Sequence, residues 1–310
     1  MSKETLLTMG MLVYNEEKYI GEAIESLLAQ TYKDFTLLIV DNASTDRTPQ
    51  ICQYYAEKDA RIVYFRNAKN MGGLFSLNYI LEQTNTPYFM LCAGHDKWHP
   101  CFVEKLLPAL EEEKVILSYP EAAAIGMDGK IRKILEYDCN TVNIGKPVDR
   151  YLRILRFFKV SHLFYGIWLT QALKNCNFNF ETYGSDSIIL EQAALAGKFK
   201  QYKEVLFWMR QNREQEVFSE TIKRQLYNAY GKKQSVFLGV ILYTLEGMKA
   251  PLDRRHSFSI ATKLWLIINV IYYKFFELYV FYILKMVLIK FIGPENYFKL
   301  RCFLKANHDE

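Results

Sequence analysis

The sequence of 310 residues has no strong excess of charge of either sign. It holds 39 Lys and Arg against 34 Asp and Glu, which gives a formal net charge of +5. Proteins that bind nucleic acid through its phosphates usually carry a larger basic excess, so nucleic acid is not an expected partner. The small excess is concentrated at the end of the chain, since residues 211–310 hold 15 Lys and Arg against 9 Asp and Glu.

The six cysteines form no Cys-x-x-Cys pair anywhere in the sequence. Paired spacing of that kind is typical of zinc sites and redox motifs, and a disulfide framework is typical of short secreted chains. The pattern therefore favours reduced, buried thiols in a cytoplasmic protein.

The last third of the chain lacks an uninterrupted hydrophobic run. Within residues 263–290 the longest stretch without charge is Leu264–Tyr273, whereas a membrane-spanning helix needs roughly 20 such residues. Lys263, Lys274 and Lys285 recur at a spacing close to three helical turns, which predicts one basic stripe on a helix. Such a stripe beside a wide apolar face is typical of a helix that lies in a membrane interface. Two interpretations stay open for this segment: peripheral contact with the inner membrane face, or packing against another subunit or domain.

What the chain does contain is an alternation of short apolar runs with helical periodicity. Strands are expected at 6–13, 35–40, 61–65, 88–92, 115–124, 131–135 and 205–209, and helices at 19–30, 48–58, 74–83 and 102–113. The turn at Asp128-Gly129 predicts a hairpin before the 131–135 strand. Strands that alternate with helices predict an α/β protein with a mostly parallel sheet, and only helices are expected after Ser219.

Carboxylate and amide side chains follow the first two strands directly. Tyr14-Asn15-Glu16-Glu17 ends the first apolar run, and the stretch from Asp41 to Thr48 ends the second. In an open parallel sheet, ligands bind at the carboxyl ends of the strands. Asp41 is suited to accept a hydrogen bond from a nucleotide base, and its context suits a turn cap as well.

These strand ends resemble the opening of the family 2 glycosyltransferases. The likeness lies in residues 12–17, 27–32 and 40–48, continues through Asn70-x-Gly72 to Asn78, and extends more loosely to about residue 215. It implies a GT-A, Rossmann-like catalytic domain over 1–215. The last hundred residues fall outside the likeness, and their own pattern predicts an α-helical region over 216–310 that contacts a membrane or forms an oligomer. The resemblance also implies inverting transfer of a sugar from a nucleotide-sugar donor, expected to be a UDP-sugar, to a hydroxyl acceptor. A polysaccharide or lipid-linked glycan precursor is the expected acceptor, because it would explain the basic and aromatic C-terminal segment.

The resemblance assigns roles to individual residues as well. The donor nucleotide is expected to contact Tyr14, Asn15, Glu16, Asp41, Asn70, Gly72, Asn78 and Arg210, with Asp41 at the base and Arg210 at a phosphate. Asp186 is expected to act as the base that takes a proton from the acceptor hydroxyl; the alternative is an N-cap for a helix over 188–196.

The expected metal motif departs from the family pattern. Ala93 stands where the first Asp of the family motif is usual, and His95 and Asp96 occupy its last two positions. Imidazole and carboxylate are both ligands for Mn²⁺ or Mg²⁺, and such an ion would offset charge on the donor diphosphate. The alternatives are a metal-independent reaction, with His95 ordering the loop, and a non-catalytic nucleotide-binding scaffold for a partner transferase.

Overall fold

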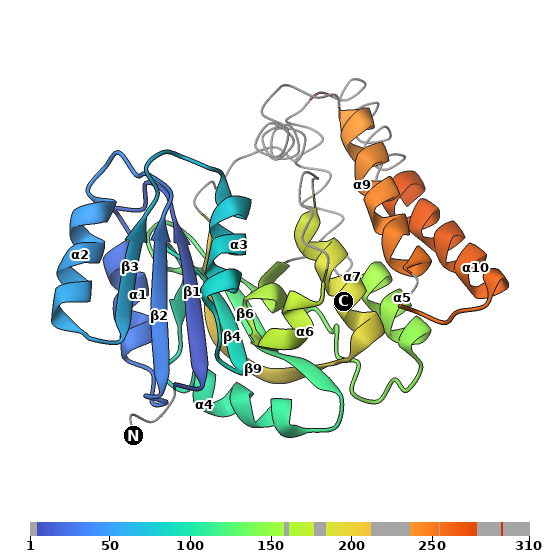
Figure 1. Cartoon of the computed structure of the whole chain (residues 1–310), viewed down its shortest axis with the longest axis horizontal. Coiled ribbons are helices and arrows are strands. Elements are labelled where there is room, and N and C mark those ends of the chain that lie inside the picture. Colours follow the sequence, from blue (N-terminus) through green and yellow to red (C-terminus); the bar gives the residue numbers. More distant parts are fainter. Residues whose placement is uncertain are drawn as a thin grey trace. The chain divides into compact units, whose positions relative to one another are not determined.

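The computed structural model describes residues 5–157, 161–176, 184–211, 236–253, 255–277 and 293. The chain divides into two compact units, Met1–Thr221 and Ile222–Glu310 (Figure 1). The domain boundary expected at residues 215 and 216 falls outside the described residues, and it stays a prediction.

The first unit is built on a sheet whose first half is parallel. Its strands are β1 (Leu7–Val13), β2 (Phe35–Asp41), β3 (Ile62–Arg66) and β4 (Tyr88–Ala93), and they lie in the order β3-β2-β1-β4. All three pairings in this half are parallel. The α/β fold with a mostly parallel sheet is therefore confirmed, and the carboxyl ends of these strands meet at one edge.

The second half of the sheet mixes strand directions. It continues from β4 through β8 (Ile167–Leu169), β6 (Val115–Ile125), β9 (Lys198–Arg210) and β5 (Lys97–Trp98), with β7 (Ile131–Leu135) paired to β6. Strand β8 is antiparallel to both neighbours, and β5 is antiparallel to β9. The predicted hairpin between β6 and β7 is confirmed. The sequence missed β5 and β8, which are too short for periodicity to reveal, and β9 begins earlier than expected.

Helices cover both faces of this sheet. They are α1 (Ile20–Leu28), α2 (Thr48–Lys58), α3 (Gly73–Gln83), α4 (Phe102–Leu106), α5 (Pro147–Phe157), α6 (Thr170–Lys174) and α7 (Ser185–Ala196), with 3-10 turns η1 (Leu107–Glu111) and η2 (Ser161–Tyr165). The single helix expected over 102–113 is therefore an α-helix that continues as a 3-10 turn. Pro108 lies at the start of that turn, where its missing N–H prevents the α-helical pattern from continuing.

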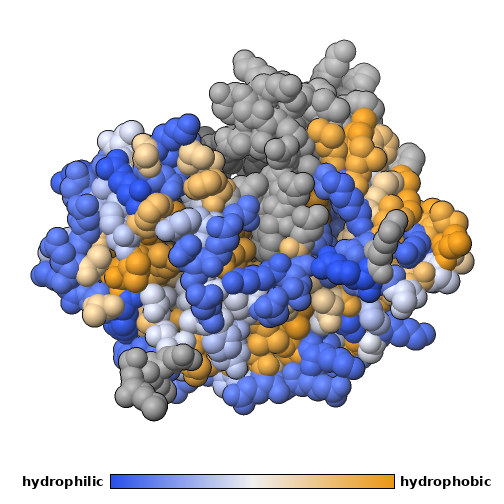
Figure 2. All heavy atoms as spheres, in the orientation of Figure 1, coloured by the Kyte–Doolittle hydropathy of each residue, from blue (hydrophilic) through white to orange (hydrophobic). Residues whose placement is uncertain are grey.

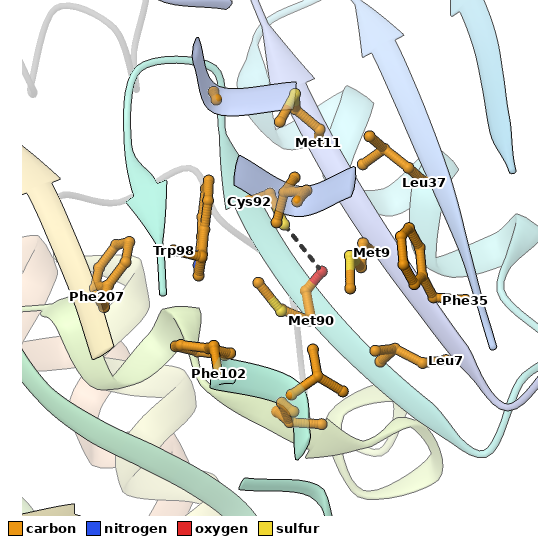
Figure 3. Close-up of a cluster of buried hydrophobic side chains, with 14 of the residues drawn as sticks. Leu7, Met9, Met11, Phe35, Leu37, Met90, Cys92, Trp98, Phe102 and Phe207 are labelled. Atoms are coloured by element: carbon orange, nitrogen blue, oxygen red, sulfur yellow. Dashed lines mark hydrogen bonds between the residues drawn. The ribbon is translucent and has the colours of Figure 1, made fainter. Parts of the chain in front are cut away.

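Two hydrophobic clusters lie on the opposite faces of the sheet. Alternate residues of β2 separate between them: Leu37 and Ile39 belong to the first cluster, while Leu38 and Val40 belong to the second. Figure 3 shows the first cluster, in which β1 and β4 side chains pack with Trp98 and Phe207. Because burial of one such side chain contributes about 1.5–3 kcal/mol, these two layers hold the strand ends in register.

The second unit contains helices α9 (Val236–Leu252) and α10 (Ile260–Val270), followed by a π-helical segment, η3 (Ile271–Glu277). These elements agree with the expectation of helices late in the chain, and residues 278–290 lie outside the described part. No helix within the described residues combines the length and apolar character that crossing a membrane requires.

The prediction of a basic stripe over residues 263–290 is wrong for the part that the structure describes, residues 263–277. Lys274 is 2% exposed, and its Nζ lies 3.7 Å from the centroid of the Tyr243 ring. The reason is local geometry, since η3 has the wider π-helical turn and a repeat counted in α-helical turns no longer marks one face. Lys285 lies outside the described residues.

The exposed side of α10 and η3 is apolar instead. The exposed residues recur every four positions, as Ile260, Leu264, Ile268 and Tyr272, with Trp265 beside them. Figure 2 shows hydrophobic side chains gathered over α9 and α10. We call these five residues the α10 apolar face.

Candidate active site

The loops that follow β1 and β2 are joined by hydrogen bonds. Three consecutive N–H groups of the first loop donate to side chains of the second: Asn15 to Ser44 Oγ at 3.0 Å, Glu16 to Thr48 Oγ1 at 2.8 Å, and Glu17 to Asp46 Oδ2 at 3.1 Å. In return, Asn15 Oδ1 accepts from the N–H of Thr45 at 2.8 Å. The Ser, Thr and Asp residues after β2 therefore fix the turn after β1. We call this hydrogen-bonded contact between the two loops the joint, and the Asn15 side chain is part of it.

Asp41 lies at the base of this joint and is fully buried. Its Oδ1 accepts from the Ser44 N–H at 2.8 Å, and its Oδ2 accepts from the Tyr64 hydroxyl at 2.8 Å. The Arg66 Nε lies 3.4 Å from the same Oδ2. The turn-cap role is therefore observed, and the expected contact of Asp41 with a base stays a prediction.

Tyr64 and Arg66 were not among the site residues expected from the sequence. Both belong to β3, and the parallel register sets Arg66 directly opposite Asp41. The sequence did hold a signal for them. Tyr64 and Arg66 are two residues apart on a strand expected next to β2, so both side chains point to the same face of the sheet.

Asparagines shape the next loop, between β3 and α3. The Asn42 Oδ1 accepts from Asn67 Nδ2 and from the Met71 N–H, and its Nδ2 donates to Asn70 Oδ1 at 2.7 Å. Gly72 precedes α3 with a φ of 86°, a left-handed value that favours glycine. Asn70 and Gly72 therefore position this loop beside Asp41, while Asn78 lies partly exposed on α3.

The strand β4 leads into the His95-Asp96 pair. His95 Nδ1 lies 2.8 Å from Glu16 Oε1, and His95 Nε2 lies 3.9 Å from Asp96 Oδ1. Burial of Asp96, which is 1% exposed, raises the pKa of its carboxyl to about 6. Burial alone would lower the pKa of His95, but the Glu16 hydrogen bond and the nearby carboxylates raise it. The structure thus brings Glu16, His95 and Asp96 together.

These residues suit a divalent ion only in part. Among the described residues, no three His, Cys, Asp or Glu side chains lie together as a metal-binding group. A histidine whose Nδ1 is held by a carboxylate is nevertheless the arrangement that presents Nε2 to a metal. An ion held by His95 and Asp96 would therefore need its remaining ligands from the diphosphate of a donor and from water.

Arg210 lies under this loop, and its side chain is 2% exposed. Its Nε donates to the His95 carbonyl at 2.9 Å, its Nη1 to the Gly126 carbonyl at 3.2 Å, and its Nη2 to Glu22 Oε2 at 2.5 Å. The guanidinium also stacks over the Tyr19 ring at 4.4 Å. Each nitrogen of the guanidinium is engaged, so the expected phosphate contact of Arg210 stays a prediction, and its observed place is structural.

Asp186 lies inside the first turn of α7. The helix begins at Ser185 with Gly184 as its N-cap at a φ of 71°, so the interpretation of Asp186 as the N-cap of a helix over 188–196 is wrong. Its Oδ1 accepts from the Ser187 N–H at 2.9 Å. The side chain is partly buried.

Tyr165 ends the η2 turn, which packs against both β4 and α7. Burial raises the pKa of this phenol, and the negative charges of Asp96 and Asp186 raise it further. Tyr14, the first residue after β1, is exposed at 45%.

Comparison with known proteins identifies the family to which these features correspond. A sequence profile described as Glycosyl transferase family 2 matches residues 8–169, just over half of the chain. The chain is 37% identical over 115 residues to the putative glycosyltransferase EpsE of Bacillus subtilis, covering 37% of this chain and 41% of that protein. It is 31% identical over 116 residues to the putative teichuronic acid biosynthesis glycosyltransferase TuaG of the same organism, covering 37% and 46%. In both matches the chain spans less than half of the relative's length.

Solved structures share the fold. S. aureus TarS in complex with UDP-GlcNAc aligns with a TM-score of 0.63 and 17% identity, covering 86% of this chain and 72% of that one. The mannosyltransferase PcManGT of Pyrobaculum calidifontis, in complex with GDP-Man and Mn²⁺, aligns with a TM-score of 0.52 and 15% identity, covering 86% and 79%. The helix-flanked sheet of this chain is thus that of GT-A transferases.

Proposed function

The chain belongs to glycosyl transferase family 2, and we propose that it transfers a sugar from a nucleotide-sugar donor to a hydroxyl group of an acceptor. The observation that supports this most directly is that Asp96 follows β4 and Asp186 lies in the first turn of α7, while the η2 turn packs against both β4 and α7. One carboxylate follows the strand where a diphosphate is expected, and the other begins the helix where an acceptor is expected. Transfer between two substrates needs both groups near one reacting carbon.

In the proposed reaction Asp186 is the general base. It takes the proton of the acceptor hydroxyl as that oxygen attacks the anomeric carbon, and the bond from this carbon to the diphosphate oxygen breaks on the opposite face. The outcome is inversion at the anomeric carbon. A positioned base of this kind contributes about 10²–10⁴-fold to the rate.

The donor is proposed to be a UDP-sugar that lies along the ends of β1, β2 and β4. The proposed nucleotide contacts are Tyr14, Asn15, Glu16, Asp41, Asn70, Gly72, Asn78 and Arg210, with Asp41 at the base. Mn²⁺ or Mg²⁺ bound by His95 and Asp96 would supply positive charge to the leaving diphosphate. UDP-GlcNAc in the TarS structure and Mn²⁺ in the PcManGT structure support this choice of donor and ion for proteins of this fold.

The acceptor is proposed to be a polysaccharide or lipid-linked glycan precursor at a membrane. The support lies in the α10 apolar face, with Ile260 exposed at 79% and Ile268 at 63%, in a chain segment with a basic excess. Exposed apolar side chains suit insertion into a lipid interface, and the basic excess of the segment favours anionic lipid. Residues 216–310 are thus proposed as the membrane-contacting region of a peripheral protein.

The experiment that tests the proposed function is a panel of nucleotide sugars, measured for binding and for nucleotide release with and without Mn²⁺ or Mg²⁺. Metal-dependent turnover of one donor is the expected result. Binding without turnover, even with lipid extracts as acceptor, would contradict the transferase and favour the non-catalytic scaffold. Turnover that is equal with and without metal would contradict only the ion site.

A further inference from the structure

Tyr165 lies on a turn that packs against both the strand before Asp96 and the helix that carries Asp186 in its first turn. It ends η2 and is followed by Gly166 and then β8. In the antiparallel pairing of β8 with β4, Met90 lies opposite Ile167, so continuation of that register brings Tyr165 toward Cys92 at the end of β4. A Cβ on Gly166 would lie 2.4 Å from the Ser118 carbonyl oxygen, which shows how tightly the backbone here is pressed against β6.

The ring of Tyr165 is held by aromatic neighbours. It stacks on Phe207 with centroids 5.6 Å apart and an interplanar angle of 30°, and it meets the edge of Phe164 at 6.5 Å. Phe207 lies opposite Trp98 in the β5–β9 pairing, and Trp98 follows Asp96 by two residues. The ring is thus anchored on the side of the acidic loop after β4.

The other side of Tyr165 is the start of α7. The η2 turn packs against both β4 and α7, and Asp186 lies in the first turn of that helix. The Tyr64 hydroxyl is bonded to Asp41, whereas within the described part of the chain the Tyr165 hydroxyl has no hydrogen-bond partner. Its side chain is partly exposed. A phenol, with an ordinary pKa of about 10, is protonated at neutral pH, so the Tyr165 hydroxyl can donate a hydrogen bond.

We propose that the hydroxyl of Tyr165 donates a hydrogen bond to a hydroxyl oxygen of the sugar that is transferred, and so selects the donor sugar. The inference rests on the proposed function. In the transition state the anomeric carbon lies between the leaving diphosphate oxygen and the attacking hydroxyl oxygen. The sugar ring must therefore lie between the Asp96 side and the Asp186 side of the site, which is where Tyr165 stands.

A site of this kind discriminates between donor sugars, because the wrong sugar leaves a polar group of the protein without a hydrogen-bond partner. A sugar that lacks the matching hydroxyl leaves the phenol without a partner, and sites built to bind a substrate hydroxyl reject such analogues strongly. Tyr165 is therefore assigned as a specificity residue that touches the donor sugar, distinct from the residues expected at the nucleotide.

The test compares Tyr165→Phe with wild type, because this change keeps the stacked ring and removes only the hydroxyl. The matched control is Tyr32→Phe. The Tyr32 hydroxyl is buried without a partner and precedes β2, at the edge of the sheet opposite the strand carboxyl ends. Each variant is measured for kcat/KM with the preferred donor, for affinity toward the free nucleoside diphosphate, and for kcat/KM with deoxy-sugar donors.

The expected result is a fall of about tenfold or more in kcat/KM for Tyr165→Phe, in line with the loss of one hydrogen bond. Affinity for the free nucleoside diphosphate should not change, and the difference from wild type should vanish with the one deoxy-sugar donor that lacks the contacted hydroxyl. Tyr32→Phe should match wild type throughout.

Two outcomes would overturn the role of Tyr165 without contradicting the proposed function. One is a working wild type whose kcat/KM is unaffected by Tyr165→Phe. The other is an equal loss in sugar turnover and in nucleoside diphosphate affinity, which would indicate a general disturbance of the site. A wild-type protein that turns over no nucleotide sugar would contradict the proposed function itself.

Discussion

Asp96 Oδ1 accepts a 2.7 Å hydrogen bond from the backbone N–H of Arg210, a residue 114 positions later in the chain. This contact ties the loop after β4 to the last residue of β9, and the Arg210 guanidinium reinforces it through the His95 carbonyl. The geometry of the acidic loop therefore depends on the end of β9. A change at Arg210 should reach the reaction through Asp96 and His95.

We expect Arg210→Leu to destabilise the first unit by about 3 kcal/mol, because it leaves three carbonyls and one carboxylate without their buried donor. Urea unfolding of the variant and wild type measures this difference. The control is Arg47→Leu, whose side chain is 81% exposed and 3.8 Å from Glu17; its effect should stay below about 0.5 kcal/mol. Equal effects of the two changes would contradict the structural role of Arg210.

Gly166→Ala should destabilise the protein by about 1–3 kcal/mol, since its Cβ would lie 2.4 Å from a backbone oxygen that cannot turn aside. The same change at Gly145, where a Cβ meets nothing within 4 Å, should cost nothing. Thermal unfolding of both variants gives the comparison. A stable Gly166→Ala protein would show that the chain around Tyr165 is less tightly held than the structure indicates.

Asp46 should make stability depend on pH. Burial raises the pKa of the Asp46 carboxyl. Hydrogen bonds from the Thr48 side chain and from the N–H groups of Thr48 and Glu17 outweigh this effect, so the pKa of Asp46 lies below its usual value. A carboxyl with a lowered pKa in the folded state contributes stability above the unfolded pKa and loses it as the pH falls through the folded pKa.

The Asp46→Asn protein should therefore be less stable than wild type at pH 7, with a difference that shrinks as the pH falls below about 4. Urea midpoints across that range measure it, with Glu57→Gln, an exposed residue of α2, as the control. A difference that stays constant with pH would show that the Asp46 charge does not stabilise the joint between the first two loops.

The α10 apolar face should govern binding to lipid. We expect the double change Leu264→Asp and Ile268→Asp to reduce sedimentation with vesicles that contain phosphatidylglycerol, and wild type to bind vesicles of phosphatidylcholine alone more weakly. Ile131→Asp, an exposed apolar residue on β7, is the control. The contrary outcome is a wild type that does not bind vesicles but forms a dimer that the double change disrupts. That result would indicate that the α10 apolar face contacts a second copy of the chain.

The parallel half of the sheet was predictable because its signals are local. The runs at β1 and β2 are apolar, bounded by polar turns and separated by helical periodicity, and the polar residues after them mark the ligand edge. His95 and Asp96 were predicted instead from the resemblance of the stretch after β4 to the metal motif of the family.

The long-range part of the site was not predictable in this way. Strands β5 and β8 are two and three residues long, which is too short for a period to appear. The burial of Arg210 depends on carbonyls from the loop after β6, and Tyr165 meets its neighbours through the β4–β8 pairing. Likewise, Lys274 was expected on a basic stripe because spacing alone does not reveal a π-helical segment.

The role of Asp186 as the base is tested most directly by nucleotide release from the preferred donor, measured for wild type and Asp186→Asn with acceptor present. We expect Asp186→Asn to bind the donor as wild type does and to lose about 10²–10⁴-fold in turnover, because the acceptor proton then has no base. An Asp186→Asn protein with near wild-type turnover would contradict the assignment of this carboxylate as the base.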